Sequence, residues 1–288
     1  MKAVFLLLQE LLPQHLLSRL AGKLAECRVK WLKNFLIKRF IAAYGVNMRE
    51  ALHERPEYYE HFNAFFTRAL KPGLRPLPID ATTIVCPADG AISAIGSIND
   101  DSIFQAKGKS FSLKALVGGD AEWAKAFRNG HFATVYLSPK DYHRVHMPFT
   151  GMLQEMIYVP GELYSVNQTT AENIDGLFAR NERAVCLFTT DAGPMAVILV
   201  GAMIVAGIET VFAGQVAPAG KQIQRTSYAS KDKQIKLERG AELGRFKLGS
   251  TAIVLFGAGN MAWDANFGTG TATRMGQSFG TVSGLKAD

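Results

Sequence analysis

The sequence predicts an α+β protein whose body is a mostly antiparallel β barrel or sandwich and whose amino terminus forms amphipathic helices. Apolar residues recur at helical spacing through residues 1–45. From about residue 82 the chain changes to short β-rich runs separated by turns. The sequence has no strand–helix alternation at βαβ spacing, which argues against a Rossmann sheet. A length of 288 residues with 48% hydrophobic content fits one large domain with an appended segment.

The amino-terminal segment combines apolar faces with positive charge. Residues 1–50 hold nine Lys and Arg against three Glu, and nine minus three gives +6 of the formal net charge of +7. No apolar run approaches the ~20 residues of a membrane span, and the short run Val4–Leu8 is not a secretory signal. We expect residues 1–60 to form a helical segment that lies in the headgroup layer of an anionic membrane. The alternative is that its helices simply pack on the protein body.

Residues 46–80 connect this segment to the body. The pattern from Tyr58 to Leu70 predicts an amphipathic helix, ended by Lys71-Pro72-Gly73 and followed by a proline-marked extended connector. Beyond the connector we expect strands at 83–86, 91–98, 131–137, 152–159, 184–190, 195–205, 208–216 and 252–256, and short helical elements at 112–117 and 121–128.

Cysteine usage indicates a reducing compartment. The three cysteines are widely spaced, so no disulfide framework and no metal-ligand spacing is implied: Cys27, Cys86 and Cys186. A zinc site would want further Cys, His or carboxylate ligands near the histidines, and the sequence offers none at readable spacing. We therefore expect no metal.

The stretch Leu248-Gly249-Ser250-Thr251 lies at the mouth of the apolar run 252–256. Glycine leaves its carbonyl open to approach, and the hydroxyl of the next residue can turn back on that carbonyl. With a base nearby, this is the local chemistry of an N→O acyl shift. The simpler interpretation is a glycine turn that leads into a buried strand.

Two histidines and one aspartate are candidates to assist such chemistry. His143 and His146 follow a proline turn, and each is open to a structural role, a role as general base, or metal ligation. Asp89, in a Pro-Ala-Asp-Gly turn, either caps its own backbone or orients a histidine as in Ser-His-Asp sites. The order Asp89, His146, Ser250 is compatible with such a site.

Six segments together carry a resemblance to a known family: Phe62–Arg68, Pro87–Gly90, Lys107–Leu113, Tyr142–Pro148, Pro160–Asn167 and Gly244–Thr251. On these segments the chain resembles the pyruvoyl-dependent phosphatidylserine decarboxylases of prokaryotic type. The histidine segment and the Leu-Gly-Ser-Thr segment are the specific ones.

The resemblance implies a proenzyme, with a decarboxylase domain over 61–288, that cuts itself between Gly249 and Ser250. The products are a β chain of residues 1–249 and an α chain of residues 250–288. In this scheme Ser250 Oγ attacks the Gly249 carbonyl, His146 takes the proton and Asp89 holds the imidazole. Residue 250 then becomes a covalent pyruvoyl group, the implied cofactor.

The resemblance also implies the reaction, which converts phosphatidylserine to phosphatidylethanolamine. The serine amine would form a Schiff base with the pyruvoyl group, which accepts the electrons released as CO2 leaves, and His143 is the candidate proton donor. Since residues three apart on a straight strand face opposite ways, two histidines in one pocket require a bend near Ser138-Pro139. A homodimer of αβ units on the cytoplasmic face of the cell membrane is implied as well.

Two other classes of function compete with this interpretation. A Ser-His-Asp hydrolase would use the same residues on an external ester, although the sequence has no Gly-x-Ser-x-Gly elbow. A membrane-associated protein without catalysis is the other. Nucleic acid is not an expected partner, because the basic segment contains no recognisable binding motif.

Overall fold

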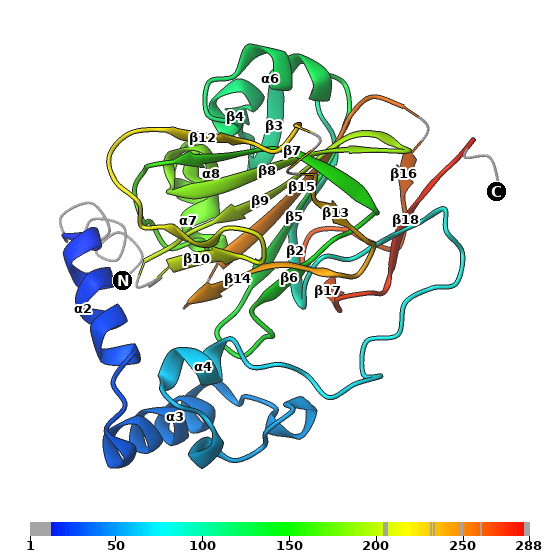
Figure 1. Ribbon diagram of the computed structural model, residues 1–288. Helices are drawn as coiled ribbons and strands as arrows, with labels where there is room; N and C mark the ends of the chain where they lie inside the picture. Colours follow the sequence, from blue (N-terminus) through cyan, green and yellow to red (C-terminus); the bar gives the residue numbers. More distant parts are fainter. Residues whose placement is uncertain are drawn as a thin grey trace.

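The body of the protein is built on a nine-stranded antiparallel sheet (Figure 1). The computed structural model describes residues 13–203, 207–230, 232, 234–247, 250–259 and 261–284. Among these residues the sheet is open, and its strands run in the order β12 (Gln224–Ser227), β7 (Gly151–Val159), β8 (Arg183–Thr190), β9 (Gly193–Val200), β15 (Ser250–Phe256), β5 (His131–Leu137), β2 (Gly90–Ser97) and β17 (Ala272–Thr273), with β13 (Lys236–Leu237) also on β7.

Both faces of this sheet are covered, and this explains why its central strands are apolar along their whole length. In β15, Ala252, Val254 and Phe256 belong to one core, whereas Ile253 and Leu255 belong to the other. Two smaller sheets cover the first face: β11 (Gly214–Ala217), β10 (Gly207–Thr210), β14 (Glu242–Lys247) and β6 (Arg144–His146), then β1 (Thr83–Val85), β18 (Ser278–Val282) and β16 (Met261–Trp263).

The second face is covered by a hairpin and short helices: β3 (Ser102–Ala106), β4 (Lys109–Ser112), α5 (Leu113–Leu116), α6 (Ala121–Phe127), α7 (Gln168–Asn173) and α8 (Leu177–Arg180). The expected α+β fold with a mostly antiparallel body is therefore confirmed. Its form is sandwich-like, because the sheets of the described residues do not close into a barrel.

The amino-terminal helices project from this body (Figure 1). They are α2 (Gln14–Ala25), α3 (Lys30–Tyr44), the 3-10 turns η1 (Met48–Glu50) and η2 (Pro56–Tyr58), and α4 (Phe62–Phe66). Residues 1–12, which the sequence predicts to begin the first helix, lie outside the described residues. In the part of the chain that the structure describes, no helix has both the length and the hydropathy needed to cross a membrane.

The helices α3 and α4 share a small apolar core of their own, which also includes residues between and before them: Ala25, Ile37, Val46, Tyr59, Phe62, Phe65 and Phe66. The helix expected from Tyr58 to Leu70 is thus much shorter than predicted. His61 caps its start by accepting the backbone N–H of Ala64. After Thr67 the chain turns, and the Arg68 guanidinium enters the body, where it donates to the carbonyls of Lys140 and Asp141.

Most of the expected strands are present within one or two residues of their predicted bounds. Two predictions are wrong in detail. The strand expected over 195–205 ends at Val200, and the single strand expected over 208–216 is a hairpin of β10 and β11, with a turn at residues 211–213. A residue such as Gly214, at φ +67°, permits the tight turn that hydrophobic pattern alone did not reveal.

Candidate active site

Ser250 is the first residue of β15, at the centre of the large sheet. The strand before it, β14, ends at Lys247 and belongs to the four-stranded sheet, so consecutive strands of the chain lie in different sheets. Gly249, on the other side of the predicted cleavage, lies outside the described residues. Ser250 pairs with Leu137 of β5 and is fully buried. Its Oγ has no hydrogen-bond partner among the residues that the structure describes.

The two histidines lie on either side of a change from loop to strand. Ser138 donates both its backbone N–H and its hydroxyl to Asp141 Oδ2, at 2.7 Å each, and this closes a turn after β5. Strand β6 begins only at Arg144. The bend that the sequence requires for His143 and His146 to serve one pocket is therefore present.

His143 is enclosed in an apolar setting. Its ring stacks on Phe66 with centroids 3.9 Å apart, and neither ring nitrogen has a hydrogen-bond partner in the described part of the chain. Burial, and then the nearby Arg68 charge, lower the pKa of His143 to about 3. The ring is therefore neutral at physiological pH.

His146 is held by two hydrogen bonds. Its Nδ1 lies 2.8 Å from the carbonyl of Gly240 and its Nε2 lies 3.0 Å from the hydroxyl of Tyr142. A carbonyl can only accept, so the proton is on Nδ1, and Nε2 accepts from Tyr142. Burial lowers the pKa of His146 and raises the pKa of Tyr142 to about 12. The neutral hydroxyl of Tyr142 is thus hydrogen-bonded to Nε2, the nitrogen of His146 that can accept a proton.

Asp89 lies beside His146 but is bonded to other groups. The backbone N–H of His146 donates to Pro87, two residues before Asp89, at 2.8 Å. The Asp89 carboxylate accepts from Arg75 through both oxygens, at 3.0 and 2.5 Å, and from the N–H of Met275 at 2.8 Å. In this structure, then, the imidazole of His146 is oriented by Gly240, and the expected Asp89–His146 hydrogen bond is replaced by the Arg75 pair.

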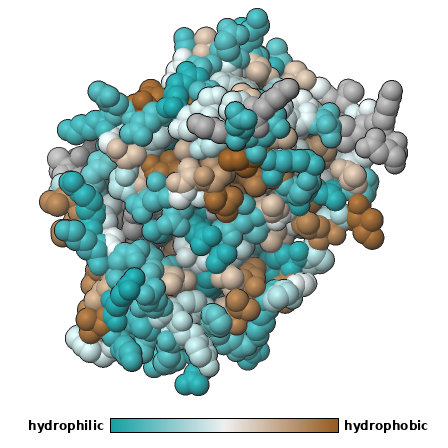
Figure 2. Space-filling model, viewed as in Figure 1, coloured by the Kyte–Doolittle hydropathy of each residue, from teal (hydrophilic) through white to brown (hydrophobic). Residues whose placement is uncertain are grey.

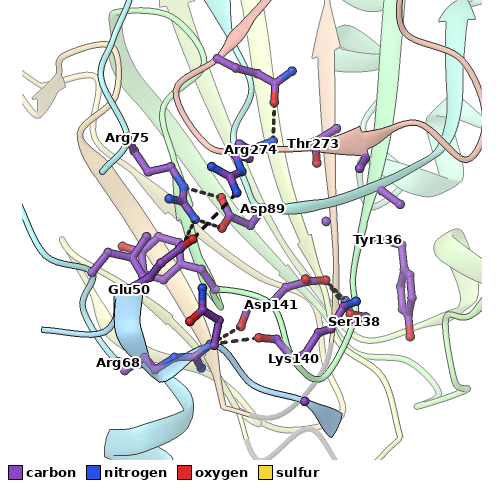
Figure 3. Close-up of a pocket in the computed structure, with 18 residues that line it drawn as sticks. Glu50, Arg68, Arg75, Asp89, Tyr136, Ser138, Lys140, Asp141, Thr273 and Arg274 are labelled. Carbon is purple, nitrogen blue, oxygen red and sulfur yellow. Dashed lines mark hydrogen bonds and ion pairs between the residues drawn. The ribbon is translucent and has the colours of Figure 1, made fainter. Parts of the chain in front are cut away.

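A cavity of about 750 Å³ opens in front of Asp89 (Figure 3). It lies between the body and the amino-terminal segment, because Gly45, Asn47 and Glu50 form part of its lining. Asp89 and Tyr142 also line it, whereas Ser250, His143 and His146 are not among its lining residues. Asp89 and Tyr142, the hydrogen-bond partner of His146, thus lie at the cavity, whereas His146 lies behind Tyr142 and Ser250 lies in the large sheet.

The sequence analysis did not predict three side chains of this site: Glu50, Arg75 and Tyr142. Tyr142 lies inside the histidine motif, so its position was a usable signal. Arg75 lies in the proline-marked connector, where nothing local distinguishes it from a solvated charge. Its side chain is only 6% exposed, and that burial is visible only in the folded protein.

Replacing His143 with Phe should make the protein less sensitive to acid. The unfolded histidine binds a proton near pH 6.5, but the folded one does so only near pH 3. The stability that neutral His143 contributes is complete above pH 6.5 and is lost as the pH falls below it, at ~1.4 kcal/mol per pH unit. The free energy of unfolding can be measured with urea from pH 7 to pH 4 in a Ser250→Ala background. As the pH falls, it should decrease more steeply for the parent, which keeps His143, than for His143→Phe.

The exposed His53, replaced by Asn, is the matched control for this measurement. Parallel stability curves for His143→Phe and its parent would contradict the buried neutral state of His143.

Comparison with known proteins agrees with the sequence resemblance. The family model described as phosphatidylserine decarboxylase matches residues 62–281, and a second one, described as PSD, matches residues 4–45. A protein of Pseudomonas putida named phosphatidylserine decarboxylase proenzyme is 62% identical over 275 residues, which are 95% of this chain and 96% of that protein. A protein of the same name from Azotobacter vinelandii is 60% identical over 281 residues, 97% of this chain and 98% of that one. The chain belongs to the phosphatidylserine decarboxylase family.

Proposed function

We propose that this chain is the proenzyme of a decarboxylase that converts phosphatidylserine to phosphatidylethanolamine. The observation that carries the proposal is the family match over residues 62–281, which contains the histidine motif and the Leu-Gly-Ser-Thr segment. The names of the relatives include the word proenzyme, which supports a processed chain.

The processing step begins with Ser250. Its hydroxyl is buried and has no partner among the described residues, so no hydrogen bond to them must be broken before it reacts. His146 Nε2 is the nitrogen without a proton and takes the hydroxyl proton once Tyr142 moves aside. The Gly249 carbonyl carbon then passes from the backbone nitrogen of residue 250 to its Oγ. The new ester loses the carboxylate of Gly249 by β-elimination, and water replaces the nitrogen of residue 250, which leaves as ammonia.

The surroundings of Ser250 fit the pyruvoyl group that this sequence of steps would leave there. When formed, this group supplies an electrophilic carbonyl that accepts the electron pair released as CO2 departs. It would lie among apolar strands of the large sheet, and both faces of that sheet are buried. Water is therefore excluded from the reacting bonds. Asp89 and His146 serve the cut, whereas His143 serves the second reaction.

His143 is the proposed donor of the proton that replaces CO2 on the α-carbon. Its ring is neutral in the uncleaved chain, because burial disfavours the charged form. A carbon that carries negative charge beside the ring favours proton release to that carbon. The stacking contact with Phe66 fixes the plane of the ring, so the direction of proton delivery is set by the amino-terminal segment as well as by the body.

The amino-terminal helices are proposed to lie on the membrane that holds the lipid substrate. Helix α2 turns its polar side to the body, where the backbone N–H of Leu163 donates to Gln14. Three leucines of α2 and two aromatic residues of α3 face outward: Leu16, Leu20, Leu24, Trp31 and Phe35 are 48 to 72% exposed. Figure 2 shows hydrophobic groups at the left and lower-left edge, over the region of α2 and α3. An exposed apolar face beside Lys and Arg fits an anionic headgroup layer.

We therefore place the enzyme peripherally on the cytoplasmic face of the cell membrane. The homodimer of αβ units remains an expectation drawn from the family.

Ser250→Ala should remain a single chain. Without the hydroxyl there is no nucleophile, so denaturing electrophoresis should show only the 288-residue product, whereas the parent should yield a fragment of about 4 kDa. Thr134→Val is the matched control, because the buried hydroxyl of Thr134 on the neighbouring strand β5 likewise has no hydrogen-bond partner within the described ranges. That variant should be cut like the parent. A parent chain that stays whole would refute the proposal and favour a hydrolase.

Reversing charge on the helical segment should weaken membrane binding. The triple change Lys23→Glu, Lys30→Glu and Arg39→Glu removes three exposed cations, each worth about 1 kcal/mol at an anionic surface. Affinity for phosphatidylserine-containing vesicles in a sedimentation assay should fall roughly 100-fold.

The control for that assay reverses three exposed cations in or just after α5 and α6: Lys114, Lys125 and Arg128. Figure 1 shows α6 at the top of the molecule and α3 at the bottom. Equal losses for both sets would point to net charge alone and would contradict docking through α2 and α3.

A further inference from the structure

Arg75 makes an unusual set of contacts for a residue of a connecting segment. Its Nε and Nη2 donate to the two oxygens of Asp89, and Nη2 also donates to Glu50 Oε2 at 2.7 Å. Its Nη1 donates to the carbonyl of Leu74 at 3.1 Å. All three guanidinium nitrogens are thus bonded in a side chain that is 6% exposed. Figure 3 shows the guanidinium between Asp89 and Glu50 at the wall of the cavity.

We propose that Arg75 is a positioning residue for the self-cleavage, and that it acts by fixing the Asp89 carboxylate beside His146. This inference rests on the proposed function, since it concerns the residues that carry out the cut. A two-point pair fixes the plane of a carboxylate as well as its distance. The third contact of Asp89 is from the N–H of Met275, which donates to Oδ1, the oxygen that also accepts from Arg75 Nε.

Arg75 also connects the carboxylate to the amino-terminal segment. Glu50 ends the 3-10 turn η1, which follows α3 after a short loop. One guanidinium therefore joins three parts of the chain: η1, the proline-marked connector and the turn that carries Asp89. The position of Asp89 therefore depends on how the helical segment sits against the body. Among the described residues, Glu50 is the residue of that segment to which Arg75 donates a hydrogen bond.

The charge of Arg75 matters to His146 as well. The groups that face His146 are Tyr142 and Arg144 on its own segment, Glu242 on β14, the Gly240 carbonyl, and Asp89. With Arg75 present, the negative charge of Asp89 is balanced by a cation. Without it, the unbalanced carboxylate favours the protonated imidazole and raises the pKa of His146. Since the base must be unprotonated to act, the cut should then require a higher pH.

The test follows cleavage of the full chain after pulse-labelled cell-free synthesis, over a range of pH, on denaturing gels. For Arg75→Gln we expect the rate at pH 7 to fall roughly 10- to 100-fold and the midpoint of the pH profile to rise by about one unit. Arg75→Lys keeps the charge without the two-point geometry, so its rate should be intermediate and its midpoint that of the parent. Glu50→Gln should also keep the parent midpoint.

Arg128→Gln, which removes an exposed guanidinium paired with Asp100, is the control and should be cut like the parent. A parent rate and midpoint in Arg75→Gln would overturn the inference while leaving the proposed function intact, whereas an uncut parent would remove the proposed function itself. If Arg75→Gln and Arg75→Lys were cut equally slowly, and both kept the midpoint of the parent pH profile, Arg75 would have only a structural role. That result would also overturn the inference. If Arg75→Gln does not fold, a parent rate in Arg75→Lys overturns the inference.

Discussion

The structure depends on one short crossing between two sheets. Strand β14 ends at Lys247, paired with Gly207 in the four-stranded sheet, and β15 begins at Ser250, paired with Leu137 in the nine-stranded sheet. Three residue steps separate them, so their Cα atoms are at most about 10 Å apart. The ladders on both sides thus fix where the serine can lie. The histidine segment is fixed by the same ladders, because β6 pairs with β14. The pairing of the strands therefore places Ser250 and the histidine segment, and loop residues such as Gly240 add individual hydrogen bonds.

The same pairing explains how a cut at this bond can leave the protein whole. An unpartnered buried hydroxyl costs about 1–3 kcal/mol, and a strand held by β9 on one side and β5 on the other can supply that stability. The chain after the cut would keep these strand partners, since β18 pairs with β1 and β16, and β17 pairs with β2. Asp89 accepts from Met275, so after the proposed cut the turn that carries Asp89 would still be bonded to the smaller chain.

The sequence predicted the strands of the body and the segment that carries the site, because those features are local. Hydrophobic runs identify strands such as 131–137, and two short motifs make His143, His146 and Ser250 candidates for the site. Contacts between distant segments were not predictable in this way. That Gly240 orients His146, that Phe66 stacks on His143 and that Arg75 pairs with Asp89 all depend on how the sheets and the connector come together. The predicted length of the helix at 58–70 was wrong for the same reason. The contacts of Arg68 with Lys140 and Asp141, which follow the end of α4, join segments distant in the sequence. In the described part of the chain after Phe256, β18 pairs with β1 and β17 pairs with β2, and these pairings also join distant segments.

The account stands on the bond that precedes Ser250, and the intact mass of the purified protein under denaturing conditions tests it most directly. The account predicts two species, residues 1–249 and residues 250–288. The smaller one should be lighter than the unmodified peptide by one molecule of ammonia, because the serine oxygen leaves with Gly249 and water supplies the keto oxygen. Hydroxylamine should then add once to the small species and not to the large one. A single unprocessed mass in protein that releases CO2 from phosphatidylserine would contradict the account.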